Sequence, residues 1–198
     1  AMACRLRSRT GVLVLATVFF SALVAEACTR AVYLGPEGRV LTGRSMDWKL
    51  PIVSNLWVFP RGIERDGSTG VRPVKWTSRY GSLVVSGYDI STCDGMNEAG
   101  LMVNLLWEVN AKYPADDGVT PRISLSVFPQ YILDRYATVA EAVNDLRANP
   151  VHAATAPLPF DVSRLATVHL SLSDATGDSA VIEFIDGQTV IHHGRAYQ

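Results

Sequence analysis

The longest apolar segment of the chain lies close to its start, in residues 11–24 (GVLVLATVFFSALV). Arginines precede this segment, and the small-residue motif Ala-Glu-Ala follows it at 25–27. A basic start, an apolar run shorter than the ~20 residues of a membrane span, and an A-x-A site are typical of a cleaved secretory signal. The pattern therefore predicts a signal peptide over residues 1–27, and a secreted or periplasmic chain that begins with Cys28.

Short β-prone runs separated by turn signals follow this leader. Residues 28–34 and 39–46 flank Gly-Pro-Glu-Gly, which predicts a β-hairpin. Residues 52–59 form another β-prone run and predict a further strand. Two more runs, 74–78 and 82–88, are joined around Arg-Tyr-Gly and predict a second hairpin.

The most apolar strand comes next, at residues 101–107 (LMVNLLW), after a turn at 97–100. A nearly continuous apolar strand is typical of burial on both faces, so we expect another layer of structure over it. Strands return near the end of the chain, at residues 167–172, 180–185 and 189–192, with turn signals between them.

Helical periodicity appears only in the middle of the chain. Apolar residues at helical spacing predict a helix over residues 127–136, with Pro129 near its start, where a helix tolerates proline. Thr138 followed by Glu141 is a capping box and predicts a second helix that ends before Pro150. The buried stripe of that second helix should consist of Ala140, Val143 and Leu146.

The order of these elements, strands followed by helices and again by strands, predicts an α+β fold. Antiparallel sheets with helices packed on one face are the usual result of such segregated blocks. The residues after the leader are enough for one domain with a proper core, and 48% of the chain is hydrophobic. The net charge is −1 and no basic stripe follows the leader, so nucleic acid is excluded as a partner class.

The candidate chemistry centres on Cys28. Cleavage after Ala27 would give this residue a free α-amine beside its thiol, a nucleophile and a base on one residue. Their ordinary pKa values, about 8.5 for a thiol and about 7.7–8.0 for an α-amine, suit proton transfer near neutral pH. The end of the second hairpin strand returns beside the start of the first, so Arg44 and Asp47 should approach Cys28. A guanidinium can stabilise a thiolate, and a carboxylate can hold the amine in place.

The residues alone leave other interpretations open. The apolar leader could remain as an uncleaved membrane anchor. Cys28 could be acylated in a lipoprotein, although Ala25 and Glu26 fit that signal poorly. Cys28 and Cys93 could form a disulfide in an oxidising compartment. Arg44 and Asp47 could be an ordinary surface ion pair.

Three motifs together resemble the choloylglycine hydrolase family, which contains penicillin V acylases and bile salt hydrolases. These are Ala-x-Ala-Cys-Thr at 25–29, Gly-Arg-Ser-Met-Asp-Trp at 43–48 and Asp-Gly-Met-Asn-Glu-Ala-Gly-Leu at 94–101. The resemblance covers residues 28–198 and implies an N-terminal-nucleophile hydrolase with a four-layer αββα fold. It implies hydrolysis of a linear, non-peptide amide.

The resemblance also implies roles for individual residues. Cys28 would be the nucleophile, with its own amine as the base, and Arg44 and Asp47 would position and activate it. Trp107 would contribute a backbone amide to the oxyanion hole. Trp48, with the secretory signal, is similar to the Gram-negative branch associated with penicillin V and N-acyl-homoserine lactones, and Trp48 and Trp107 would both suit a small amide substrate with a bulky apolar group.

The same resemblance sets expectations for the rest of the molecule. The family places an oxyanion asparagine and a later arginine beyond residue 198, so we expect residues 28–198 to be the N-terminal part of such a domain, with the C-terminal part missing. The family also suggests a homotetramer. No cofactor is expected. The histidines and the Asp116-Asp117-Gly118 loop lack the ligand spacing of a metal site, so no metal is predicted.

Overall fold

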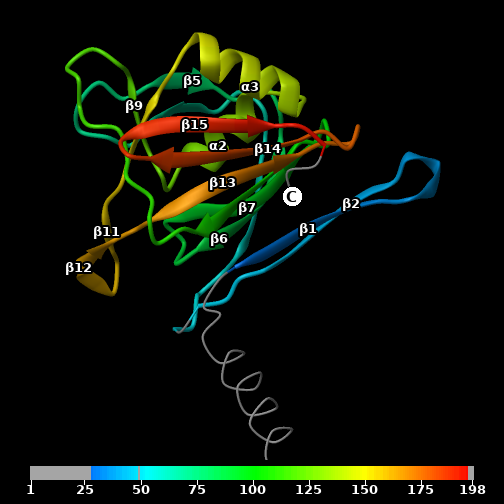
Figure 1. The fold of residues 1–198 in the computed structure, drawn as a ribbon, viewed down its shortest axis with the longest axis horizontal. Coiled ribbons are helices and arrows are strands. Elements are labelled where there is room, and N and C mark those ends of the chain that lie inside the picture. Colours follow the sequence, from blue (N-terminus) through cyan, green and yellow to red (C-terminus); the bar gives the residue numbers. More distant parts are fainter. Residues whose placement is uncertain (1–27, 49, 196–198) are drawn as a thin grey trace, which may run out of the picture.

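A computed structural model describes residues 28–48 and 50–195, so the predicted signal peptide over 1–27 lies outside the described residues. The centre of the molecule is a seven-stranded sheet in which every neighbouring pair is antiparallel (Figure 1). Its strands in sheet order are β15 (Gln188–His193), β14 (Ser179–Ile185), β13 (Val168–Ser173), β8 (Met102–Trp107), β7 (Ser91–Asn97), β6 (Ser82–Gly87) and β3 (Leu56–Phe59).

Shorter pairs of strands and two α-helices surround this sheet. The first hairpin is β1 (Thr29–Leu34) with β2 (Val40–Ser45), joined through a short 3-10 turn η1 (Pro36–Gly38). The other pairs are β4 (Glu64–Asp66) with β5 (Lys75–Thr77), β9 (Arg122–Ser124) with β10 (His152–Ala154), and β11 (Pro157–Leu158) with β12 (Asp161–Leu165). The helices are α2 (Phe128–Arg135) and α3 (Val139–Ala148).

The helices cover one face of the sheet, and the β1–β2 hairpin lies on the other face (Figure 1). Helix α2 contacts β7 and β8, and α3 contacts β14. The core between helices and sheet contains fully buried side chains such as Ile132, Leu133, Leu170 and Ile182. Burying a side chain of this size contributes about 1.5–3 kcal/mol to folding. The predicted α+β class is therefore confirmed, with a helical layer, a sheet and a hairpin as successive layers.

Strand β8 is buried on both faces, as its apolar sequence predicts. Four of its six positions are buried. Helix α2 packs against it on one side, and side chains of the β1–β2 hairpin reach it on the other, where Arg30 Nε donates to Asn104 Oδ1 at 2.8 Å.

The two predicted helices are present, with differences at the second one. Pro129 lies in the first turn of α2. Thr138 caps α3, because its Oγ1 accepts from the Glu141 N–H at 3.2 Å, but the Glu141 carboxylate accepts from Ala137 N–H, one residue earlier than a capping box requires. The predicted stripe is wrong at Ala140, which is half-buried. The buried positions of α3 are Val139, Ala142, Val143 and Leu146.

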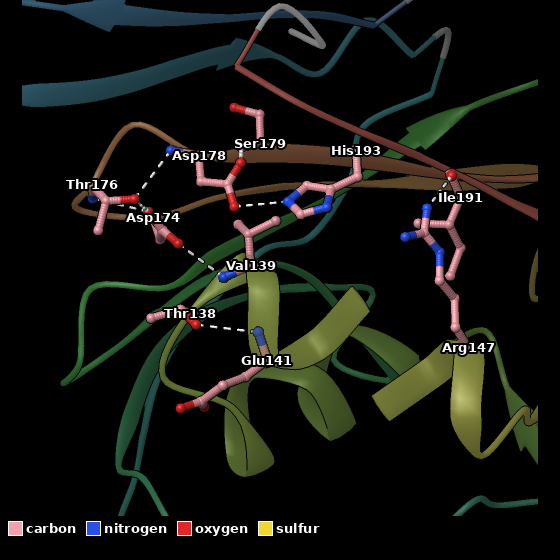
Figure 2. A network of polar contacts seen from close by, with 10 residues as sticks. All are labelled: Thr138, Val139, Glu141, Arg147, Asp174, Thr176, Asp178, Ser179, Ile191 and His193. Carbon is pink, nitrogen blue, oxygen red and sulfur yellow. Dashed lines mark hydrogen bonds and ion pairs between the residues drawn. The ribbon is translucent and has the colours of Figure 1, made fainter. Parts of the chain in front are cut away.

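A polar network joins α3 to the turn between β13 and β14 (Figure 2). Asp174 Oδ2 accepts from the Val139 N–H at 2.9 Å, which satisfies a backbone donor at the helix start. Asp174 Oδ1 accepts from the backbone and hydroxyl of Thr176, which holds the turn in shape. His193 Nε2 lies 2.8 Å from Asp178 Oδ2, so strand β15 is tied to the same turn.

Some predicted pairings are wrong. Residues 74–78 do not pair with 82–88: β5 pairs with β4, whereas β6 pairs with β3 and β7. The connection between them is no hairpin turn, since the N–H groups of Arg79 and Tyr80 both donate to the Asp134 carbonyl of α2. In the predicted strand 52–59, the regular ladder with β6 covers residues 56–59, and the carbonyls of Val53 and Asn55 accept from the N–H groups of Tyr88 and Ser86.

Strand β7 was not predicted from the sequence, because STCDGMN is polar and contains glycine. The turn that follows it at 97–100 is confirmed. Asn97 Oδ1 accepts from the N–H groups of Ala99 and Leu101, at 3.1 and 3.0 Å. Asn97 Nδ2 donates to the carbonyls of Leu133 and Tyr136, so this residue also ties the turn to α2.

Candidate active site

The β1–β2 hairpin brings Cys28 beside the residues that follow β2. Thr29 faces Ser45 in the register of the hairpin, so Cys28, one residue earlier, lies beside Met46. Arg44 and Asp47 flank this position on either side. The register thus brings these residues to the same end of the hairpin as Cys28, as the connectivity predicts.

Every predicted site residue borders one cavity of about 330 Å³. Cys28, Arg44, Asp47, Trp48 and Trp107 all line it. The rest of the lining is largely apolar and includes Met46, Ile52, Leu105, Leu125, Leu158 and Val168. A mostly apolar pocket with a few convergent polar groups is the usual form of a site for a small molecule.

Arg44 is held from two sides. Its side chain is 9% exposed, its Nε lies 3.2 Å from Asp94 Oδ1, and its Nη2 donates to the Leu105 carbonyl. Burial raises the pKa of Asp94, although the charge of Arg44 acts against this shift. The sequence did not predict Asp94 as the partner of Arg44. The signal was present, because Asp94 is an acidic residue in one of the three motifs.

Asp47 is not the partner of Arg44, so the alternative of an Arg44–Asp47 surface pair does not describe this structure. Asp47 is exposed, and its Oδ2 accepts a hydrogen bond from Ser45 Oγ at 2.8 Å. Its carboxylate borders the cavity near Cys28, where it is open to a further donor.

The thiols of Cys28 and Cys93 are both free and both border the cavity. Burial, followed by the charge of Asp94, raises the pKa of Cys93 to about 11. Cys93 occupies a β-bulge, since Val85 pairs with Asp94 and Ser86 pairs with Thr92. Gly87 makes room for this thiol, because a Cβ there would lie 2.5 Å from Cys93 Sγ.

Aromatic rings form one wall of the cavity. The ring centroids of Trp48 and Trp107 are 4.8 Å apart. Phe160, between β11 and β12, lies 6.1 Å from Trp48 and 5.0 Å from Tyr88. Arg164 stacks over Trp107 at 5.4 Å. Neither Phe160 nor Tyr88 was predicted as a site residue. The short β11–β12 segment that carries Phe160 has no apolar periodicity, and Tyr88 ended a predicted strand without a chemical signal.

Tyr88 reaches this wall from a strained turn. Tyr88, Asp89 and Ile90 join β6 to β7, and the first two both have a φ of 54°. Two left-handed residues are the pattern of a type I′ hairpin turn, which normally uses Asn-Gly, and a bulky residue in this region is unusual. The Asp89 carboxylate stabilises the turn by accepting hydrogen bonds from Ser86 Oγ and Asn55 Nδ2, each at 2.5 Å.

The sequence of residues 28–197 matches the model of the linear amide C–N hydrolases, choloylglycine hydrolase family. The chain belongs to this family. The resemblance seen in the three motifs is thereby confirmed.

Two members of the family are penicillin V acylases with substantial identity to this chain. The enzyme of Pectobacterium atrosepticum is 43% identical over 203 aligned positions, which cover 98% of this chain and 54% of the relative. The structure of the enzyme from Agrobacterium tumefaciens is 56% identical, with a TM-score of 0.77, and the match covers 85% of this chain and 50% of that one.

A more distant member has the same fold. A variant of the conjugated bile acid hydrolase from Clostridium perfringens superposes with a TM-score of 0.69 at 23% identity, covering 85% of this chain and 51% of the other. This choloylglycine hydrolase family chain therefore spans about half the length of the relatives it matches, and its fold is that of the N-terminal-nucleophile hydrolases.

Two further observations concern the described part of the chain. Within residues 28–48 and 50–195, His, Cys, Asp and Glu side chains do not gather into a group of three or more that could hold a metal ion. Among the same residues, no helix has the length and apolar character needed to cross a membrane.

Proposed function

We propose that this chain supplies the nucleophile and the substrate pocket of an exported amidase that hydrolyses linear amides through Cys28. The observation that carries the proposal is the single cavity bordered by Cys28, Arg44, Asp47, Trp48 and Trp107. These residues come from the open end of the first hairpin, opposite its turn, and from the end of β8. Membership of a family of linear amide C–N hydrolases gives the reaction class.

The reaction begins when signal peptidase cuts after Ala27 and exposes the α-amine of Cys28. The amine accepts the thiol proton as the sulfur attacks the amide carbonyl. The tetrahedral intermediate then collapses, the C–N bond breaks and the amine passes the proton to the leaving nitrogen. Water, activated by the same amine, attacks the thioester and releases the carboxylic acid and the free sulfur.

Arg44 and Asp47 assist this sequence in different ways. The guanidinium of Arg44 stabilises negative charge on the sulfur. The exposed carboxylate of Asp47 accepts a hydrogen bond from the new ammonium or amine of Cys28 and orients it.

The backbone of Trp107 fits the role of an oxyanion donor. Glu108 N–H donates to the Thr167 carbonyl, and donors alternate along a strand, so the Trp107 N–H is directed away from β13. The β7–β8 ladder ends at Asp94 and Asn104, so the backbone of β8 beyond this pair borders the cavity. We assign this N–H to the substrate carbonyl oxygen, on which negative charge develops in the transition state.

The cavity favours substrates with a bulky apolar acyl group. Trp48, Trp107 and Phe160 provide aromatic surface, and about 330 Å³ is enough for a ring-sized group. The relatives are named for penicillin V and for a conjugated bile acid, each with an amide beside such a group. We include N-acyl-homoserine lactones in the same class.

Intact mass and turnover together test the proposal, in the protein expressed with all of its natural sequence. We expect a mature chain that begins at Cys28 with a free thiol and hydrolyses penicillin V. Placing one uncleaved residue ahead of Cys28 should abolish turnover while leaving the fold unchanged. Turnover by that version at the natural rate would contradict the mechanism. An added lipid, or a loss of two hydrogens from a Cys28–Cys93 disulfide, would instead support a non-catalytic envelope protein.

A further inference from the structure

The buried face of the β1–β2 hairpin carries two arginines directly opposite each other. Arg30 on β1 pairs in register with Arg44 on β2. Directly opposed like charges destabilise a strand pair, and burial strengthens the repulsion. Arg30 is 8% exposed, and burial lowers its pKa to about 10, so it remains charged at neutral pH. The fold must therefore separate or neutralise these guanidinium groups.

Asp94 and Asn104 both separate and neutralise the two guanidinium groups. They face each other across β7 and β8, and Asn104 Nδ2 donates to Asp94 Oδ1 at 2.6 Å. The Asp94 carboxylate lies 3.2 Å from Arg44 Nε, and the amide oxygen of Asn104 accepts a hydrogen bond from Arg30 Nε at 2.8 Å. Because they bind different partners, the two arginine side chains point in different directions, Arg44 toward the cavity and Arg30 away from it.

The chain of contacts continues from Arg30 back to strand β2. Arg30 Nη2 donates to Ser173 Oγ at 2.7 Å, and Ser173 Oγ lies 2.8 Å from Thr42 Oγ1. Thr42 and Arg44 are two residues apart on β2, so the chain of contacts starts and ends on the same strand. The order of the chemical groups fixes the Asn104 amide, since its oxygen must face a donor and its nitrogen an acceptor.

The end of the β7–β8 ladder makes room for Arg44. Beyond Asp94, the bulge at Cys93 turns β7 away, and Thr92 N–H donates to Ser126 instead of β8. The Leu105 carbonyl, beyond the last β7 partner, accepts from Arg44 Nη2. Two fixed acceptors, Asp94 and Leu105, therefore hold the plane of the guanidinium.

We infer that Asp94 and Asn104 are positioning residues that direct Arg44, rather than Arg30, to the cavity that holds Cys28. The inference rests on the proposed function. Neither residue is among those that line the cavity, so each acts through Arg44.

A charge swap tests the inference. Asp94→Asn removes the carboxylate beside Arg44, and Asn104→Asp sets a second carboxylate against Asp94. The double variant keeps the same atoms in the chain of contacts: a carboxylate at 104 accepts from Arg30, and an amide at 94 joins it to Arg44. We expect each single variant to lower kcat for penicillin V about 10²-fold and to change KM less than about threefold. The kcat of the double variant should be at least about tenfold higher than that of either single variant.

Asp134→Asn is the matched control, because Asp134 forms a buried pair with Arg65 on the other side of the sheet at 3.1 Å. It should lower the melting temperature and leave kcat within about twofold. An equal kcat loss in this control, unchanged kcat in both single variants, or a double variant no better than the singles would each overturn the inference.

A second measurement separates failure of the inference from failure of the proposed function. If the unaltered protein hydrolyses none of the three amide classes, the proposed function fails. The inference is then decided by the rate at which iodoacetamide alkylates Cys28. Asn104→Asp should slow that rate and the double variant should restore it, whereas equal rates in all variants would overturn the inference.

Discussion

Two buried aspartate–arginine pairs lie on opposite faces of the central sheet, and they are closely similar as interactions. Asp94 Oδ1 lies 3.2 Å from Arg44 Nε on the hairpin face, and Asp134 Oδ2 lies 3.1 Å from Arg65 Nε on the helix face. In both, burial is the largest influence and raises the pKa of the aspartate. Neither the distance nor the direction of the aspartate pKa shift separates one pair from the other.

Their surroundings separate them. Asp134 also accepts from Trp76 Nε1 and Gln130 Nε2, each at 2.7 Å, and Arg65 stacks over Phe59 at 4.4 Å. These groups enclose Asp134 within the core, while Arg65 stays partly exposed. On the hairpin face, Arg44 borders a cavity that also holds a free thiol. A perturbed acid marks a candidate site only where a nucleophile and space for a substrate accompany it.

Removing the arginine from each pair should give the largest contrast. Arg44→Met and Arg65→Met each leave a buried carboxylate without its partner, so each should destabilise the fold by about 3–5 kcal/mol. Only Arg44→Met should also remove charge stabilisation beside Cys28, lowering kcat/KM about 10²–10³-fold. Urea unfolding measures the loss of stability. Penicillin V hydrolysis, measured on the folded fraction, gives the loss of kcat/KM.

The milder variants Arg44→Lys and Arg65→Lys serve as controls for folding, since each keeps a charge. An Arg65→Met protein that is folded but as inactive as Arg44→Met would remove the distinction between the two faces. The proposed role of Arg44 would then have no support from this comparison.

The tryptophan near each pair offers a second contrast. Trp76→Phe removes the Nε1–H that donates to Asp134, so it should destabilise the fold by about 1–3 kcal/mol and leave turnover unchanged. Trp48 Nε1 is buried without a hydrogen-bond partner among the described residues, so Trp48→Phe breaks no such bond. It should raise KM by about threefold to tenfold through lost ring contact. Thermal melts and steady-state kinetics distinguish the two, and a KM effect in Trp76→Phe would contradict the assignment.

The part of the candidate site that could be predicted from the sequence follows from local connectivity. Arg44 and Asp47 lie in a hairpin with a short turn, so their approach to Cys28 needs only the register of two adjacent strands. Helices α2 and α3 were also predictable, because apolar spacing and the Thr138 cap are local signals.

The rest of the site and of the fold depends on contacts between segments far apart in the chain. Asp94 lies on β7, whose polar, glycine-containing sequence shows no strand alternation. Phe160 lies between two-residue and five-residue strands, which are too short to carry a periodic pattern. Residues 74–78 and 82–88 were mispaired because the contact that separates them is made to Asp134 of α2. Such contacts become visible only when the layers have packed.

The pH dependence of stability should be alike for the two pairs, which sharpens the contrast in activity. Because burial raises the pKa of Asp94 and Asp134 in the folded state, each contributes most to stability below the ordinary carboxyl pKa. That contribution is lost as the pH rises through the folded value. The difference in unfolding free energy between the unaltered protein and Asp94→Asn or Asp134→Asn should therefore shrink from pH 4 to pH 7. Urea titrations at several pH values measure this difference in unfolding free energy. A difference that grows with pH would contradict the prediction.

The smallest expected effect uses Cys93 as a local reporter of charge. Burial first, and the charge of Asp94 second, raise the pKa of Cys93 to about 11. Asp94→Asn removes the second cause and should speed alkylation of Cys93 by iodoacetamide at pH 9 by about twofold to fivefold, since thiolate content changes tenfold per pKa unit. Asp134→Asn lies on the other face and should leave the rate unchanged. Peptide mapping by mass spectrometry separates the alkylation of Cys93 from that of Cys28. Because burial remains in both variants, Cys93 should stay slower than an exposed thiol throughout. Equal rates in Asp94→Asn and the unaltered protein would mean that the Asp94 charge does not reach the cavity, and that Arg44 alone sets the field there.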